Sequence, residues 1–213
     1  MNISQQSIES YVNDVISSKP VPGGGSVSAL IGSHGAALAG MLVALTTGKK
    51  AFQAFAPADQ RLFGELANFF ALQKDRLLQL ASEDIDAYEG FLTALRLPKD
   101  TPEERAVRDT RMQAAQLHAT EVPLETARTA FEALENIGPV VEKGNANAIS
   151  DAAVGAMCLN LAVQGGIYNA RINLPGLADE SLRAEVAAEC RSLQAKSEAL
   201  LRDVLAAVDT RLG

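Results

Sequence analysis

Three consecutive glycines, Gly23, Gly24 and Gly25, precede Ser26 and open a long apolar stretch of this 213-residue chain. Glycine lets a backbone bend sharply or lie flat against a large partner, and serine is a preferred residue for capping the start of a helix. The free N–H groups at such a start attract anions and carbonyl oxygens. The pattern predicts a binding site at the start of a helix, with a flexible link as the plain alternative.

Two carboxylates are candidates for acid–base chemistry. Asp84 shares a helix face with Leu80 and Tyr88, and burial beside such residues raises the pKa of a carboxyl toward neutrality, which suits a proton shuttle. Asp151 follows residues typical of a helix start and shares an apolar helix face with Cys158. A carboxylate on such a face is costly unless it has a partner or a function. An ordinary capped helix start is an equal alternative for Asp151.

Asn169 lies 18 residues after Asp151. On one helix the two side chains point the same way but stand roughly 27 Å apart. If both are functional, they serve opposite ends of a long ligand or two sites, as when subunits share clefts; Asn169 could instead satisfy free carbonyls at the helix end. Lys49 could hold a carboxylate or offset the helix dipole. His34 and His118 are isolated and are expected to be packed or surface residues.

Composition narrows the function classes. The chain carries 19 Lys and Arg against 26 Asp and Glu, a net charge of −7, with no basic run, so no nucleic-acid partner is expected. No lysine follows the glycines until Lys49, which excludes the phosphate-binding P-loop. Cys158 and Cys190 lack metal-ligand spacing, so we expect no metal site, no disulfide scaffold and a reducing cytoplasm.

The apolar stretch from Val27 to Thr47 has no charged residue, yet we do not expect a membrane span. It consists mainly of Ala, Gly and Ser, and no companion span is expected elsewhere. Small residues recur at every fourth position, which lets another helix approach closely. These residues are Ser28, Gly32, Ala36, Gly40 and Ala44.

Helical spacing of apolar residues dominates the chain, and no period-two alternation indicates a strand. We expect a single domain over 1–213, an all-α multi-helix bundle with long helices, assembled as a homo-oligomer. Pro123 is expected to kink or break its helix near Glu121. The expected helices cover about 4–18, 26–47, 62–97 as one long helix or two in line, 102–137 with this break, 147–169 and 179–211.

Four segments occur in a fixed order between Pro22 and Leu174: PVPGGGSVSAL, LTTGKK, EDIDAY followed by LRLPK, and GNANAISDAAVGA ending in YNARINL. Together they resemble the formiminotetrahydrofolate cyclodeaminase and methenyltetrahydrofolate cyclohydrolase family. The resemblance implies an all-helical fold, dimers or larger assemblies, a folate site in a cleft at the subunit interface, and no metal or cofactor besides the folate substrate.

Carried over by position, the resemblance implies acid–base roles for Asp84 and Asp151. The implied substrate-binding residues are Gly23, Gly24, Gly25, Ser26, Lys49, Asn145, Ser150 and Asn169. The expected reaction is cyclodeamination of 5-formiminotetrahydrofolate to 5,10-methenyltetrahydrofolate and ammonia, a step of histidine degradation. Open alternatives are 5,10-methenyltetrahydrofolate cyclohydrolase, a noncatalytic folate-binding or scaffold protein, and a helical hydrolase of another cyclic amidine.

Overall fold

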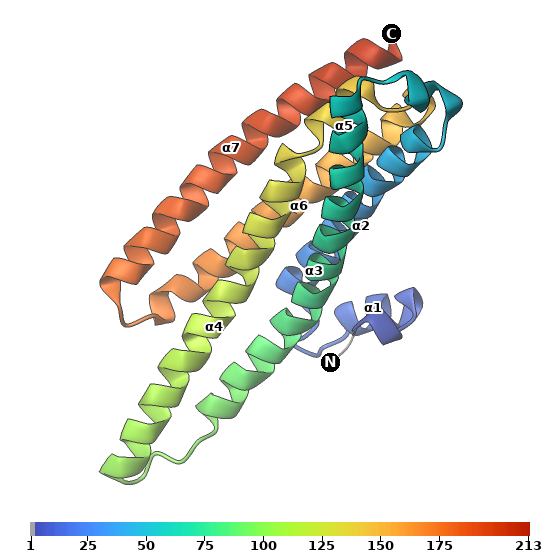
Figure 1. The fold of residues 1–213 in the computed structure, drawn as a ribbon. Coiled ribbons are helices and arrows are strands. Elements are labelled where there is room, and N and C mark those ends of the chain that lie inside the picture. Colours follow the sequence, from blue (N-terminus) through green and yellow to red (C-terminus); the bar gives the residue numbers. More distant parts are fainter. Residues whose placement is uncertain (1–2) are drawn as a thin grey trace.

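The computed structural model describes residues 3–213, and within that range every regular element is a helix (Figure 1). The expected all-α fold is therefore confirmed. The α-helices are α1 (Ile8–Val15), α2 (Gly24–Thr47), α3 (Pro57–Leu95), α4 (Pro102–Glu135), α5 (Gly138–Lys143), α6 (Ile149–Asn173) and α7 (Glu180–Leu212). Short 3-10 helices cover Ile3–Gln5, Lys50–Ala54, Ala146–Ala148 and Leu174–Gly176.

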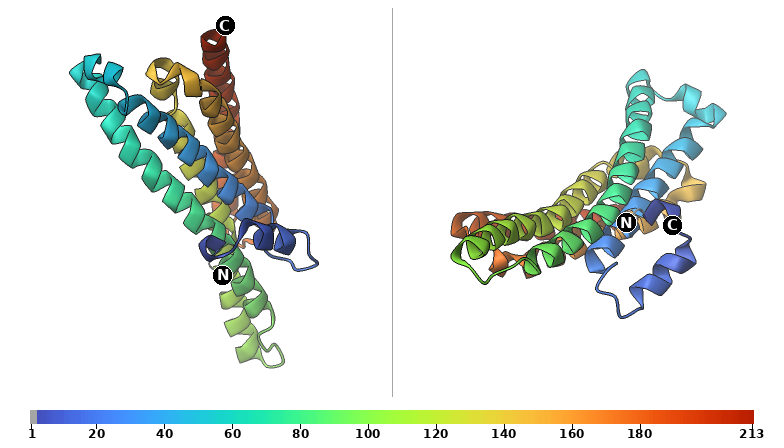
Figure 2. Two further views of the ribbon diagram at one scale, coloured as in Figure 1. Left: turned by 90° about the vertical axis from the view of Figure 1, so that its right-hand side faces the viewer. Right: turned by 90° about the horizontal axis from the view of Figure 1, so that it is seen from below.

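Four helices form the core of the bundle. Helices α2, α3, α4 and α6 pack in sequence, and α6 returns to α2, while α7 lies outside against α6 and α4. Helices α3 and α4, with 39 and 34 residues, are longer than α2 with 24. Their hairpin therefore projects beyond the other helices, and the short α1 lies beside the bundle near the start of α2 (Figures 1 and 2).

Small residues allow α2 to pack closely at the centre, as expected. A Cβ at Gly32 would lie 2.7 Å from the Cβ of Ala162 on α6, too close for any side chain. The expectation that α2 has no apolar counterpart is wrong, since Ala146–Gly176 is also long and apolar enough to cross a membrane. About half of each apolar window is buried, 50% in α2 and 44% in the second segment, as in core helices of a bundle.

Helix α4 continues through Pro123, where the sequence predicted a kink or break. Proline has no N–H for the carbonyl four residues earlier, which belongs to Ala119. The side-chain amide of Asn173, on α6, donates to that carbonyl at 2.7 Å. A partner from a neighbouring helix thus replaces the lost bond and lets α4 remain continuous.

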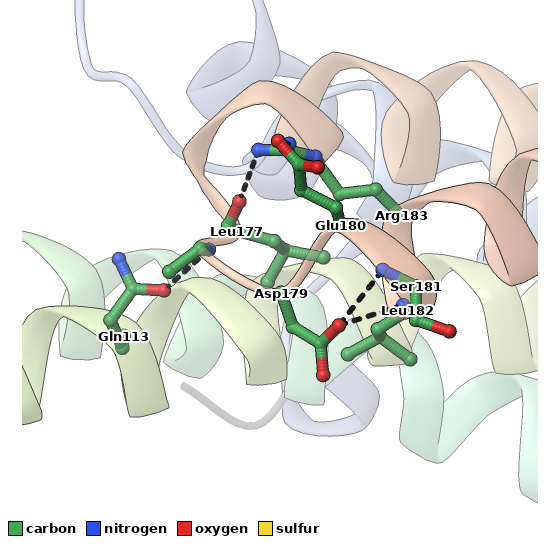
Figure 3. Close-up of polar contacts among 8 residues, drawn as sticks. Gln113, Leu177, Asp179, Glu180, Ser181, Leu182 and Arg183 are labelled. Carbon is green, nitrogen blue, oxygen red and sulfur yellow. Dashed lines mark hydrogen bonds and ion pairs between the residues drawn. The ribbon is translucent and has the colours of Figure 1, made fainter.

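Polar contacts fix the turn between α6 and α7 (Figure 3). The carboxylate of Asp179 accepts from the N–H groups of Ser181 and Leu182 and caps α7. Gln113, on α4, accepts from the N–H of Ala178 at 2.9 Å. The turn is thereby tied to α4, which holds the end of α6 in place.

Candidate active site

A cleft of about 330 Å³ lies where α2 begins, between α3, α4 and the end of α6. Asp84 is the one charged side chain among the described residues that line it. The remaining surface is backbone of the glycine segment, aromatic rings of α3 and amide side chains of α4 and α6. The lining residues are Pro20, Val21, Gly23, Gly24, Gly25, Asp84, Ala87, Tyr88, Phe91, Gln116, Ala119, Asn169, Ile172 and Asn173.

Asp84 is half-buried on the cleft side of α3, above the fully buried Leu77 and Leu80. Burial raises the pKa of its carboxyl, and the N–H of Ser26, which donates to its Oδ2 at 2.8 Å, partly opposes that rise. The expected raised pKa is therefore confirmed. A carboxyl with a raised pKa keeps its proton to higher pH than an ordinary aspartate and can exchange a proton with a bound molecule.

The start of α2 is capped by another helix. The N-cap residue is Gly23, so the expectation that Ser26 caps this helix is wrong. Gly23 has no side chain that could accept hydrogen bonds from the first N–H groups of α2. The carboxylate of Asp84, on α3, accepts a hydrogen bond from the N–H of Ser26 instead. Ser26 itself is fully buried behind the cleft lining, and its hydroxyl bonds to Tyr11 rather than facing a ligand.

The absence of a side chain at Gly25 leaves room for the Asp84 carboxylate. A Cβ there would lie 2.6 Å from the carboxyl carbon of Asp84 and closer still to one of its oxygens. Gly25→Ala is expected to displace the carboxylate and lower turnover by about a hundredfold. Alanine favours helix, so thermal unfolding should change little. The control is Gly64→Ala on α3, where an added Cβ meets nothing within 4 Å; equal activity of the two variants would contradict the prediction.

The raised pKa of Asp84 has a consequence for stability. The folded carboxyl holds its proton to higher pH than the unfolded one, whose pKa is about 3.9. The free energy that the Asp84 carboxyl contributes to folding is therefore fully present below that value and is lost as pH rises through the folded pKa. The Asp84→Asn variant does not have this loss, so its melting temperature relative to that of the wild type should increase as pH rises. A constant difference between the two proteins from pH 4 to 8 would contradict the prediction.

Amide side chains line the cleft together with Asp84. Asn169 packs against Gly24, whose added Cβ would lie 3.3 Å from the Asn169 Nδ2. Gln116 donates to the carbonyl of Asn173 at 2.6 Å. The sequence predicted Asn169 but missed Gln116 and Phe91, which carry no motif. The sole sequence signal for Asn173 is its place within YNARINL.

The other predicted residues lie at the opposite end of the α2–α6 pair. Lys49 donates to the side chain of Asn145 at 3.1 Å, and the backbone of Asn145 is held by Thr46. Asp151, half-buried in the first turn of α6, has no hydrogen-bond or ion-pair partner in the described chain, and Ser150 is exposed. Along α6 this end is roughly 27 Å from Asn169. One chain therefore does not bring Asp84 and Asp151 together.

The two histidines follow the expectation. His34 is exposed and bonds to the Leu30 carbonyl of its own helix, and His118 is exposed on α4. Residues 3–213 contain no group of three or more His, Cys, Asp or Glu side chains placed to hold a metal ion.

Comparison with known proteins identifies the family of this chain. The sequence profile of formiminotransferase-cyclodeaminase matches residues 7–192. The chain belongs to this family. The methenyltetrahydrofolate cyclohydrolase of Methylorubrum extorquens is 33% identical over 97% of this chain and 98% of its own length. The formimidoyltransferase-cyclodeaminase of Rattus norvegicus is 32% identical over 96% of this chain but only 37% of its own length.

The fold is that of a solved relative. The crystal structure of formiminotetrahydrofolate cyclodeaminase from Thermotoga maritima superimposes with a TM-score of 0.85 over 99% of this chain and 100% of the other, at 24% identity. This family member thus spans the whole of a cyclohydrolase and a cyclodeaminase, and little more than a third of the longer formimidoyltransferase-cyclodeaminases.

Proposed function

We propose that this protein is a folate enzyme acting on the carbon that joins N5 and N10 of tetrahydrofolate, and that its main reaction is cyclodeamination of 5-formiminotetrahydrofolate. The observation that carries the proposal is Asp84, whose carboxyl has a raised pKa and is the one charged group that residues 3–213 contribute to a cleft lined by glycine backbone, aromatic rings and amides. The names of the relatives supply the substrate class.

The reaction needs a group that both accepts and donates protons. N10 attacks the formimino carbon, its proton passes to the formimino nitrogen, and one further proton turns that nitrogen into departing ammonia, which leaves the methenyl bridge. Asp84 takes the first proton as a carboxylate and gives protons as a carboxylic acid, a dual role that its raised pKa suits. No cofactor beyond the folate substrate is proposed.

A specific observation favours a second reaction. The Methylorubrum extorquens cyclohydrolase is matched over nearly its whole length at 33% identity. In cyclohydrolysis water adds to the bridging carbon and loses one proton to the carboxylate. The bond to N5 then breaks as N5 takes that proton, and the hydroxyl on the carbon releases its remaining proton to solvent, giving 10-formyltetrahydrofolate. The same carboxyl serves both reactions, which differ in whether N10 or water is the nucleophile.

We further propose that the complete site forms between two copies of the chain. A cleft of about 330 Å³ is at the small end for a ligand pocket, enough for a fused ring but not for the whole folate. Exposed apolar residues run along α6 from the Lys49 end to the cleft, where Ile172 is both 78% exposed and part of the lining. These residues are Val154, Met157, Leu161, Tyr168 and Ile172, with Met41 and Leu45 on the adjoining α2.

A two-fold arrangement of this face would place Lys49 and Asp151 of one copy beside Asp84 of the other. The two ends of α2 and α6, separated in one chain, would then serve one ligand. Isolated apolar residues on a surface are ordinary, but a continuous row reaching a cleft indicates an interface.

Absorbance of the methenyl chromophore tests the reaction. Purified protein is added separately to 5-formiminotetrahydrofolate and to 5,10-methenyltetrahydrofolate. Colour appearing with ammonia supports the cyclodeaminase, and loss of colour faster than in buffer, with 10-formyltetrahydrofolate formed, supports the cyclohydrolase. No change in either tube would overturn the enzyme proposal and leave a folate-binding or scaffold protein, or a hydrolase of another cyclic amidine.

A further inference from the structure

Tyr11 anchors the otherwise loosely attached helix α1. It is the buried residue of that helix, with 6% of its surface exposed, whereas Ile8 and Val12 on the same helix are 81% and 56% exposed. Its hydroxyl forms a hydrogen bond of 2.8 Å with the hydroxyl of Ser26. The ring and hydroxyl of one tyrosine therefore join α1 to the first turn of α2.

Ser26 connects Tyr11 to Asp84. Its hydroxyl bonds to Tyr11, and its backbone N–H donates to the Asp84 carboxylate, also at 2.8 Å. As the third residue of α2, Ser26 has no intrahelical acceptor for that N–H. The three glycines that precede it are the most flexible residues available, so the first turn of α2 needs an external contact to stay fixed.

We infer that Tyr11 is a positioning residue for Asp84, holding Ser26 and the first turn of α2 so that the carboxyl keeps its place at the cleft. The inference rests on the proposed role of Asp84 in folate chemistry. Tyr11 is not among the residues that line the cleft, and its hydroxyl contacts Ser26, so it acts through Ser26. Nothing in the family motifs PVPGGGSVSAL or EDIDAY includes it.

The electrostatics agree with a neutral hydroxyl at this position. Burial raises the pKa of Tyr11 most, the bond to Ser26 opposes the rise, and the charge of Asp84 adds to it. The phenol therefore stays protonated through neutral pH and can hold the serine. Tyr88 of α3 is the other titratable group in the described cleft lining, and no cation faces Asp84 there.

Tyr11→Phe tests the inference because it removes the hydroxyl and keeps the ring. We expect kcat to fall by about ten- to a hundredfold while KM stays within about twofold. The limb of the pH–rate profile that belongs to Asp84 should move to higher pH, because a loosened Ser26 N–H donates less well to the carboxylate, and that bond is what lowers the Asp84 pKa. This direction is the same whether that limb reports a base or an acid.

Matched variants separate positioning from general damage. Ser10→Ala removes an exposed hydroxyl from the same helix and should leave kcat and the pH profile unchanged. Ser26→Ala should reproduce the Tyr11→Phe effect, and the double variant should be no worse than either single one, since both remove the same bond. Additive losses, or wild-type kinetics in Tyr11→Phe, would overturn the inference.

A second measurement does not depend on turnover. The Asp84 carboxyl carbon, assigned by its absence in Asp84→Asn, is titrated by NMR in wild type and in Tyr11→Phe. A higher pKa in Tyr11→Phe supports the positioning role, and an unchanged or lower pKa overturns it. If the wild type turns over neither folate, the proposed function fails, while this titration still decides the role of Tyr11.

Discussion

Asp84→Asn is expected to lower kcat for the folate reaction by about a hundred- to ten-thousandfold, the usual contribution of a general acid–base group. Asparagine has the shape of aspartate, and its side-chain oxygen can still accept the N–H of Ser26, so the start of α2 keeps its cap. What the variant loses is the ability to exchange a proton. Steady-state kinetics with the methenyl chromophore would measure the effect, and KM should change far less than kcat.

Asp86→Asn is the matched control for this loss. Asp86 lies two positions along the same helix, is exposed and does not line the cleft, so the same charge is removed without the same chemistry. Its kcat should stay within about twofold of wild type. If Asp84→Asn kept wild-type turnover, Asp84 would have no part in proton transfer, and the argument from its raised pKa would fail.

The contact between Asp84 and the glycine segment shows how far the sequence could be taken. Periodicity placed Asp84 on an apolar helix face, and the glycines marked a helix start, because both are local patterns. The bond from Ser26 to Asp84 joins residues 58 positions apart. No local pattern shows that these two helices meet there, so Ser26 was read as an N-cap when it is the capped residue.

Pro123 illustrates the same limit in the fold. Its local rule, that proline breaks a helix, is correct for an isolated helix. The bond from Asn173 to the Ala119 carbonyl, between residues 54 apart, changes the outcome. The sequence does not reveal Gln116 or Tyr11 for a related reason: the importance of each comes from hydrogen bonds to residues on other helices.

The family resemblance supplied what periodicity could not. It grouped Lys49, Asn145 and Asp151 with Asp84, although one chain holds them at opposite ends of the α2–α6 pair. Antiparallel helices with an exposed apolar face between two half-sites offer a physical reason for that grouping, because a two-fold axis through the face exchanges the ends. A site assembled in this way makes a quantitative prediction about mixed subunits.

Mixing Asp84→Asn with Lys49→Met subunits is expected to restore activity that neither variant has alone. Lys49→Met keeps the length of the side chain and removes its charge and its bond to Asn145. In a mixed dimer one site collects both substitutions, and the other is intact. Random assembly of equal amounts makes half of the dimers mixed, so about a quarter of wild-type activity should return if the two-fold arrangement holds.

Co-expression with two affinity tags would isolate the mixed dimer, which should carry about half of wild-type activity because one of its two sites is intact, and its turnover would be compared with each parent. The control pairs Asp84→Asn with a subunit carrying both substitutions, which leaves no intact Asp84 in either site and should restore nothing. Without recovery in the first pair, the Lys49 end and Asp84 would not share a site across the subunits. Recovery confined to the first pair would assign Asp84 to one copy and Lys49 to the other, since no arrangement within a single chain can rejoin them.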